Sequence, residues 1–97
     1  MKFNVPKSQY NLISIVRGVG YRPLGYTQGG ELNCVRPLGA DYPRFHLYIR
    51  EGSESFMFNL HLDQKRPSYQ GSTAHSGDYN SDIIKSEASR IRGIIGI

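Results

Sequence analysis

The sequence predicts a single α+β domain: a four-stranded antiparallel meander sheet with an N-terminal and a C-terminal helix packed on one face. Polar and apolar residues alternate along residues 44–50 and 55–63, the period of two that half-buried strands require. Segments with helical periodicity precede and follow the predicted strands, which gives the order α-β-β-β-β-α. At 97 residues the chain is long enough for one hydrophobic core and too short for two, so residues 1–97 form one domain.

The amino-acid composition indicates the cellular compartment of the protein and the charge of its partners. A single cysteine excludes an internal disulfide framework and is typical of a reducing compartment. No apolar run approaches the ~20 residues of a membrane span, and the first residues lack the apolar stretch of a signal peptide. We therefore expect a cytoplasmic protein with no membrane partner. The net charge of +4 favours polyanionic partners.

The N-terminal segment is predicted to form an amphipathic helix over residues 7–17. Leu12, Val16 and Val19 recur at helical spacing. Pro6 suits the first turn of a helix, where its missing N–H costs nothing, and Gly18 suits a left-handed cap. Residues 1–5 are either a short lead or an edge segment.

Residues 21–38 are predicted to form the first hairpin. Gly29-Gly30 is a turn signal between two strand-like segments. Proline lacks an N–H for the ladder, so Pro23 is expected on an edge strand. Cys34 is expected to be a small buried apolar residue of the second strand.

Residues 44–63 form the central hairpin of the prediction, closed by the loop Glu51–Glu54. This closure sets Ile49 opposite Phe56, and His46 opposite Asn59 with His61 on the diagonal. The apolar face belongs to the core, and its residues are Phe45, Leu47, Ile49, Phe56, Phe58, Leu60 and Leu62. The other face, left to solvent or to a partner, carries Arg44, His46, Tyr48, Arg50, Met57, Asn59, His61 and Asp63.

A polar loop over residues 64–80 leads into the last helix. Loops of about 15 residues are uncommon in compact domains and are usually functional or disordered. Ser81 or Asn80 is expected to cap the helix. Its apolar stripe consists of Ile84, Ala88, Ile91 and Ile95, with Ile83 widening it. Lys85, Arg90 and Arg92 lie off this stripe, and Glu87 is within i+3 reach of Arg90.

A cluster of three histidines and a carboxylate points to a metal site. Alternation in the strand puts His61 and Asp63 on one face, the hairpin brings His46 to that face, and the 64–80 loop could place His75 over it. Imidazole nitrogen and carboxylate oxygen suit a divalent zinc or manganese ion. The alternative is that each histidine is an ordinary surface or hydrogen-bonded residue.

The run HLDQK at residues 61–65, followed by His75 and Tyr79, resembles the metal and phosphate motif of the phosphoesterase domain of bacterial DNA ligase D. The resemblance implies that His61 and Asp63 hold manganese. It also implies that Lys65, His75 and Tyr79 contact phosphate, with His75 as phosphate ligand or general acid. The family's other metal histidine falls where this chain has Ser55, so His46 would take its place from the neighbouring strand. Lys65 stands where the family has arginine.

A longer resemblance carries no functional information. The segments YPRFHLYI, at residues 42–49, and FNLHLDQKRPSYQGSTAHSGDY, at residues 58–79, are similar to a group of short bacterial proteins with no established activity.

Basic residues with interleaved aromatic residues form a surface on the polar face of the hairpin and continue into the loop: Arg44, Tyr48, Arg50, Lys65, Arg66 and Tyr69. Such surfaces bind nucleic acid by neutralising phosphates and stacking bases. The first functional hypothesis is therefore a small basic module that binds a phosphate-bearing partner such as RNA or DNA. The alternatives are a phosphoesterase-like enzyme using a divalent metal at His46, His61 and Asp63, and a protein-interaction subunit.

Overall fold

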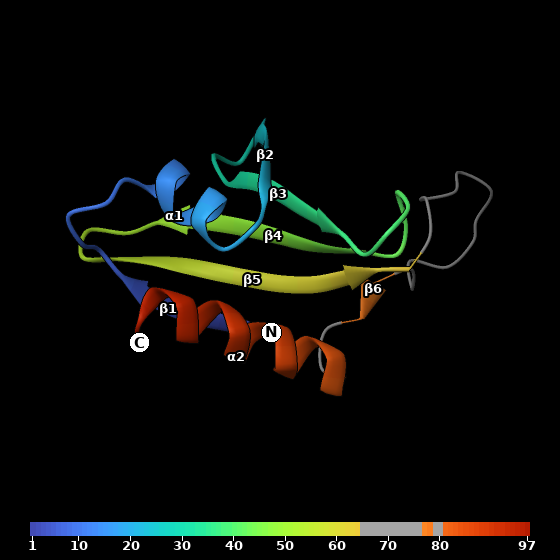
Figure 1. Ribbon diagram of the computed structural model, residues 1–97. Coiled ribbons are helices and arrows are strands. Elements are labelled where there is room, and N and C mark those ends of the chain that lie inside the picture. Colours follow the sequence, from blue (N-terminus) through green and yellow to red (C-terminus); the bar gives the residue numbers. More distant parts are fainter. Residues whose placement is uncertain (65–76, 79–80) are drawn as a thin grey trace.

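The computed structural model describes residues 1–64, 77–78 and 81–97 (Figure 1). Five antiparallel strands form one sheet in the order β1-β5-β4-β3-β2. The strands are β1 Lys2–Pro6, β2 Arg22–Tyr26, β3 Leu32–Pro37, β4 Arg44–Glu51 and β5 Ser55–Asp63. A two-residue strand, β6 Gly77–Asp78, pairs with the end of β5. The helices are α1 Leu12–Gly18 and α2 Asp82–Ile95.

The α+β class and the β2–β5 meander agree with the prediction, but the predicted count of four strands and the N-terminal position of the first helix are wrong. The chain begins with β1, which pairs with β5, so the edge-segment alternative for residues 1–5 holds. Phe3 lies opposite Phe58, and the buried Val5 lies opposite Phe56. Because β1 contains only two apolar side chains, Phe3 and Val5, its sequence alone does not identify it as a strand. Its pairing with β5 does.

Helix α1 is shorter than the predicted 7–17. It begins after Asn11, whose side chain accepts a hydrogen bond from the backbone N–H of Ser14 at 2.8 Å, a standard N-cap. Pro6 is the last residue of β1, not part of the first helical turn. The left-handed glycine after the helix is Gly20, with φ of 93°, and not Gly18. The chain therefore needs residues 7–11 to cross from the sheet to the helix.

The central hairpin has the predicted faces but a different register. Gly52 donates its backbone N–H to the carbonyl of Ser55 at 2.8 Å, which draws the strands into pairing up to the turn. Ile49 therefore lies opposite Phe58, and His46 lies directly opposite His61, two residues away from the predicted pairing. A shift of two leaves every side chain on its predicted face.

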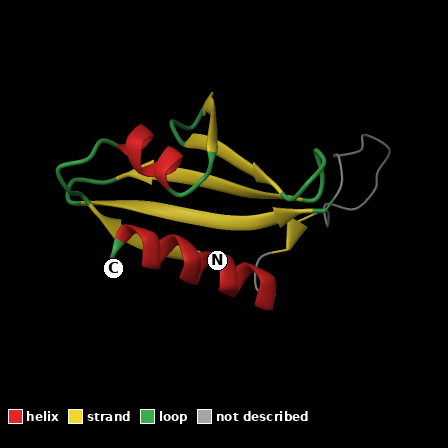
Figure 2. Cartoon of the chain, viewed as in Figure 1, coloured by secondary structure: helices red, strands yellow, loops and turns green. Residues whose placement is uncertain are grey.

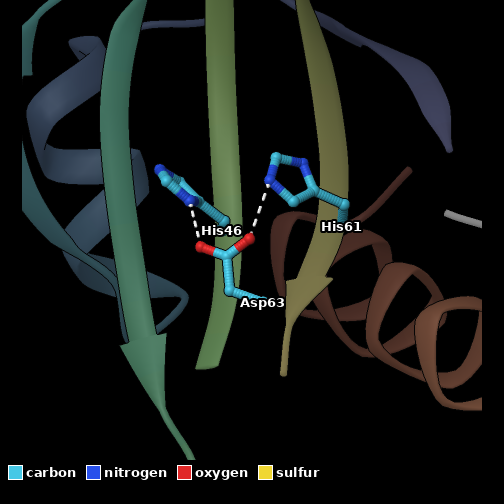
Figure 3. A group of neighbouring side chains, drawn as sticks. All are labelled: His46, His61 and Asp63. Atoms are coloured by element: carbon cyan, nitrogen blue, oxygen red, sulfur yellow. Dashed lines mark hydrogen bonds and ion pairs between the residues drawn. The ribbon is translucent and has the colours of Figure 1, made fainter. Parts of the chain in front are cut away.

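Both helices pack against the same face of the sheet, as Figures 1 and 3 show. Figure 2 shows the two helices and the strands of the sheet by secondary structure. A hydrophobic core joins the strands to residues of α1 and α2, including Val16, Phe58, Ile84 and Ile91, none of which is exposed. Cys34 belongs to this core as predicted, and its burial raises the pKa of the thiol to about 12. The opposite side of the sheet, here called the open face, carries no helix among the described residues.

Helix α2 starts after Ser81, one of the two predicted N-caps, and three residues of its predicted stripe are buried, whereas Ile95 is half-buried and Ile83 is exposed. Ser81 accepts a hydrogen bond from the backbone N–H of Ile84 at 3.3 Å, and Ile84, Ala88 and Ile91 are buried. The helix ends at Gly96 in the left-handed conformation. No helix in the described part of the chain is long and apolar enough to cross a membrane.

A polar network anchors α2 to the rest of the domain. Glu87, expected only to pair with Arg90 along the helix, is buried. Its carboxylate accepts hydrogen bonds from Tyr21 Oη at 2.6 Å, from Arg90 Nε and Nη2 at 2.8 Å each, and from Arg36 Nη1 at 3.3 Å. Arg90 Nη2 also donates to the carbonyl of Val19 at 2.6 Å. The network thus joins α2 to β3 and to the segment that follows α1.

Candidate metal centre

Three of the predicted metal-binding residues meet on the open face of the central hairpin (Figure 3). His46 comes from β4, and His61 and Asp63 come from β5. His46 and His61 are directly paired, while Asp63 follows His61 by two residues and so projects from the same face. One potential ligand atom from each residue lies within 4.8 Å of the other two.

The carboxylate of Asp63 links the two imidazole rings. Its Oδ2 atom lies 2.7 Å from Nδ1 of His46, and its Oδ1 atom lies 3.2 Å from Nε2 of His61. Arg44 Nε is 3.4 Å from the same Oδ2 atom. In this arrangement each ring donates an N–H to the carboxylate. These donor nitrogens could instead bind a metal after losing their protons.

The surroundings of Asp63 keep it ionised. Burial alone would raise the pKa of the carboxyl group. Hydrogen bonds from His46 and His61, with the charges of the two rings, outweigh burial and hold the pKa of Asp63 well below its usual range. Deprotonated carboxylate is the form that a divalent metal requires.

Asn33 is a member of the cluster that the sequence did not predict. Its Oδ1 atom contacts Nε2 of His46, the ring nitrogen that faces away from Asp63. It comes from β3, where Asn33 pairs with Tyr48. Contacts of this kind fix the orientation and tautomer of a metal-binding histidine. The pattern that could have identified Asn33 is the alternation within residues 32–37. It places the Asn33 side chain on the opposite face of the strand from Leu32 and Cys34.

Tyr48 shields the histidine pair from solvent. Its ring stacks on His46 with centroids 4.6 Å apart and on His61 at 5.5 Å. His46 and His61 are only 6% and 7% exposed. The two rings thus lie on the predicted side of the sheet, and they are buried there by neighbouring side chains. Tyr48, predicted as a partner-binding residue, is here packed against the metal-binding candidates.

Of the remaining predicted site residues, Arg44 lies beside the cluster, and the others fall outside the described part of the chain. Arg44 reaches the cluster through Asp63 and places its guanidinium over the ring of Tyr42, 4.6 Å from the centroid. The predicted residues Lys65, Arg66, Tyr69, His75 and Tyr79 lie outside the described residues. Their proposed roles in phosphate contact and general acid catalysis stay predictions.

The donor set is suited to a transition-metal ion. Two imidazole nitrogens and one carboxylate oxygen match the ligand types of zinc and manganese. Catalytic zinc sites commonly use three protein ligands and keep another position for water or substrate. The cluster thus has the donor atoms to hold an ion while leaving a coordination position unfilled by protein.

The lowered pKa of Asp63 predicts how stability depends on pH. Its contribution is fully present above about pH 5 and is lost as the pH falls through the unfolded value of about 3.9 towards the lower folded value. The free-energy difference between the wild type and Asp63→Asn should therefore shrink on acidification. Urea unfolding from pH 6 to pH 3 measures this difference, and a constant value would contradict the assignment.

Comparisons with protein-family models, with curated proteins and with solved structures found no match to this chain.

Proposed function

We propose that the protein binds one divalent ion, zinc or manganese, through His46, His61 and Asp63, and that the occupied site holds a phosphate-bearing partner on the open face. The observation that carries the proposal is the convergence of three ligand atoms within 4.8 Å from two paired strands. The ionised carboxylate supports it, since Asp63 is already in the form that binds metal.

A nucleic acid, RNA or DNA, is the proposed source of the phosphate. The chain carries a net charge of +4, and Arg44 lies directly beside the cluster. Lys65 and Arg66 follow Asp63 closely in the sequence and would extend the basic surface. Phosphate contacts of this type make affinity fall with salt, by roughly one unit of log–log slope for each contact. We place this small binding module in the cytoplasm.

A phosphoesterase-like activity is the second candidate. It is favoured by the three-residue ligand set, which leaves coordination positions for water and substrate. A metal at such a site can polarise a phosphoryl oxygen or generate a nucleophilic hydroxide. In this proposal His46, His61 and Asp63 hold the ion, and His75 acts as phosphate ligand or general acid.

The metal site is tested by metal content. After incubation with Zn²⁺ or Mn²⁺ and removal of free ion, the wild type is expected to retain about one ion per chain by elemental analysis. His61→Ala and Asp63→Asn should each weaken binding by at least about tenfold, because even outer contacts of metal sites contribute 10–100-fold. Binding should also raise the wild type's melting temperature, by mass action.

Glu31→Gln is the matched control for Asp63→Asn. Glu31 is a carboxylate next to β3 that pairs with Arg50 at 3.5 Å and lies outside the cluster. Its replacement should leave metal binding unchanged. A wild type that retains no ion and shows no thermal shift would refute the proposed site, as would His61→Ala retaining full affinity.

A further inference from the structure

Arg44 is fixed at the edge of the metal centre by two contacts. Its Nε atom lies 3.4 Å from Oδ2 of Asp63, the oxygen that also faces His46. Its guanidinium carbon lies 4.6 Å from the centre of the Tyr42 ring, within the range of a cation–π interaction. The side chain is still 21% exposed. A flexible side chain is thus held in one place beside the ligand atoms and remains accessible.

The two terminal nitrogens of Arg44 are available to a ligand. Among the residues that the structure describes, neither Nη atom has an acceptor within hydrogen-bond distance. These nitrogens form a planar fork whose N–H groups match two oxygens of one phosphate. Arg50, on the same face of the same strand, is 61% exposed and has Glu31 as its ion-pair partner.

The charges of an occupied site favour a dianionic ligand. A divalent ion and Arg44 supply three positive charges, and Asp63 supplies one negative charge. Histidines that bind a metal through nitrogen are neutral. Two positive charges would therefore stay uncompensated in a site where the ligating side chains are largely buried. Uncompensated charge in such surroundings is costly, so a ligand with two negative charges is preferred.

A terminal phosphate provides oxygens for the Arg44 fork and also carries close to the two negative charges that the occupied site favours. It has three non-bridging oxygens and a charge of about −1.5 to −2 at pH 7, whereas an internal phosphodiester has two such oxygens and a single charge. We infer that Arg44 and the metal ion together bind a terminal phosphate, with two oxygens on the Arg44 fork and the third on the ion. This inference rests on the proposed metal site and names its ligand class: phosphomonoesters and phosphorylated nucleic-acid ends.

The test compares methyl phosphate with dimethyl phosphate on Mn²⁺-loaded protein. Bound Mn²⁺ is first counted by EPR, and ligand affinity is then measured from the paramagnetic broadening of the ³¹P NMR line. Methyl phosphate is expected to bind at least about tenfold more tightly than dimethyl phosphate. Arg44→Gln should weaken methyl phosphate binding by about tenfold or more, since it removes a charge-assisted pair of hydrogen bonds. The affinity of Arg44→Lys for methyl phosphate should lie between those of the wild type and Arg44→Gln, because lysine keeps the positive charge but lacks the planar fork of two nitrogens.

Arg50→Gln is the control and should leave both affinities within about twofold, because exposed ion pairs contribute little. Equal affinities for the monoester and the diester would overturn the terminal-phosphate assignment. Normal Mn²⁺ binding with no effect of either Arg44 variant would overturn this inference alone. Absence of bound Mn²⁺ in the EPR titration would instead overturn the proposed metal site. The joint binding of phosphate by Arg44 and the ion would be overturned with it.

Discussion

Replacing Glu87 by alanine is expected to lower the free energy of unfolding by about 3 kcal/mol, near the lower end of the range for breaking a buried ion pair. The carboxylate accepts from Tyr21, Arg36 and Arg90, so its removal leaves a buried hydroxyl and two cations without the carboxylate, although Arg90 keeps its hydrogen bond to the carbonyl of Val19. The side chains of Arg36 and Arg90 are about one-third exposed and can recover part of their hydration, which limits the loss.

Urea unfolding followed by far-UV circular dichroism measures this effect. Glu54→Ala is the control, since Glu54 is exposed in the β4–β5 turn and its replacement should change stability by no more than about 0.5 kcal/mol. Tyr21→Phe should cost less than Glu87→Ala, because it removes one hydrogen bond and leaves both arginine contacts in place. A Glu87→Ala protein as stable as the control would show that the network does not anchor α2.

Replacing Phe58 by alanine is expected to lower the free energy of unfolding by about 3–5 kcal/mol, the usual cost of emptying a buried aromatic site. Phe58 is not exposed at all and lies in β5, between β1 and β4. Its ring packs 5.5 Å from that of Phe3, and Ile49 is its cross-strand partner. The strands on both sides hold this space open, so a cavity would remain.

Met57→Ala is the control for this variant. Met57 precedes Phe58 in the same strand but points to the open face and is only half-buried, so its truncation should cost well under the loss at Phe58. The same denaturant titration gives both values. Equal losses at the two positions would contradict the assignment of the core to one face of β5.

The position of the candidate metal centre in the sheet holds its ligand side chains in defined places. Its three ligands stand on β4 and β5, the most extensively paired strands, and Asn33 reaches it from β3. Sites built on strands hold their side chains more precisely than sites built on loops. A metal bound here would therefore need little rearrangement of the backbone.

Local patterns in the sequence predicted the faces of the central hairpin, the edge position of Pro23 and the burial of Cys34, and they narrowed the cap of the last helix to Asn80 or Ser81. The side of the sheet on which His46, His61 and Asp63 lie follows from alternation alone, because it depends only on neighbouring residues of one strand. The first strand and the hairpin register could not be obtained in this way. A strand of five residues carries little signal, and a register shift of two leaves the alternation unchanged.

The sequence by itself determined which residues of the central hairpin share a face, and so placed His46, His61 and Asp63 on the same side of the sheet. Only the tertiary structure decided that His46 lies directly opposite His61, that Asn33 and Tyr48 close around them, and that Glu87 is buried. The physical reason is the range of the interactions involved. Periodicity and capping are set by residues a few positions apart, whereas these contacts depend on pairing and packing between segments that are distant in the chain.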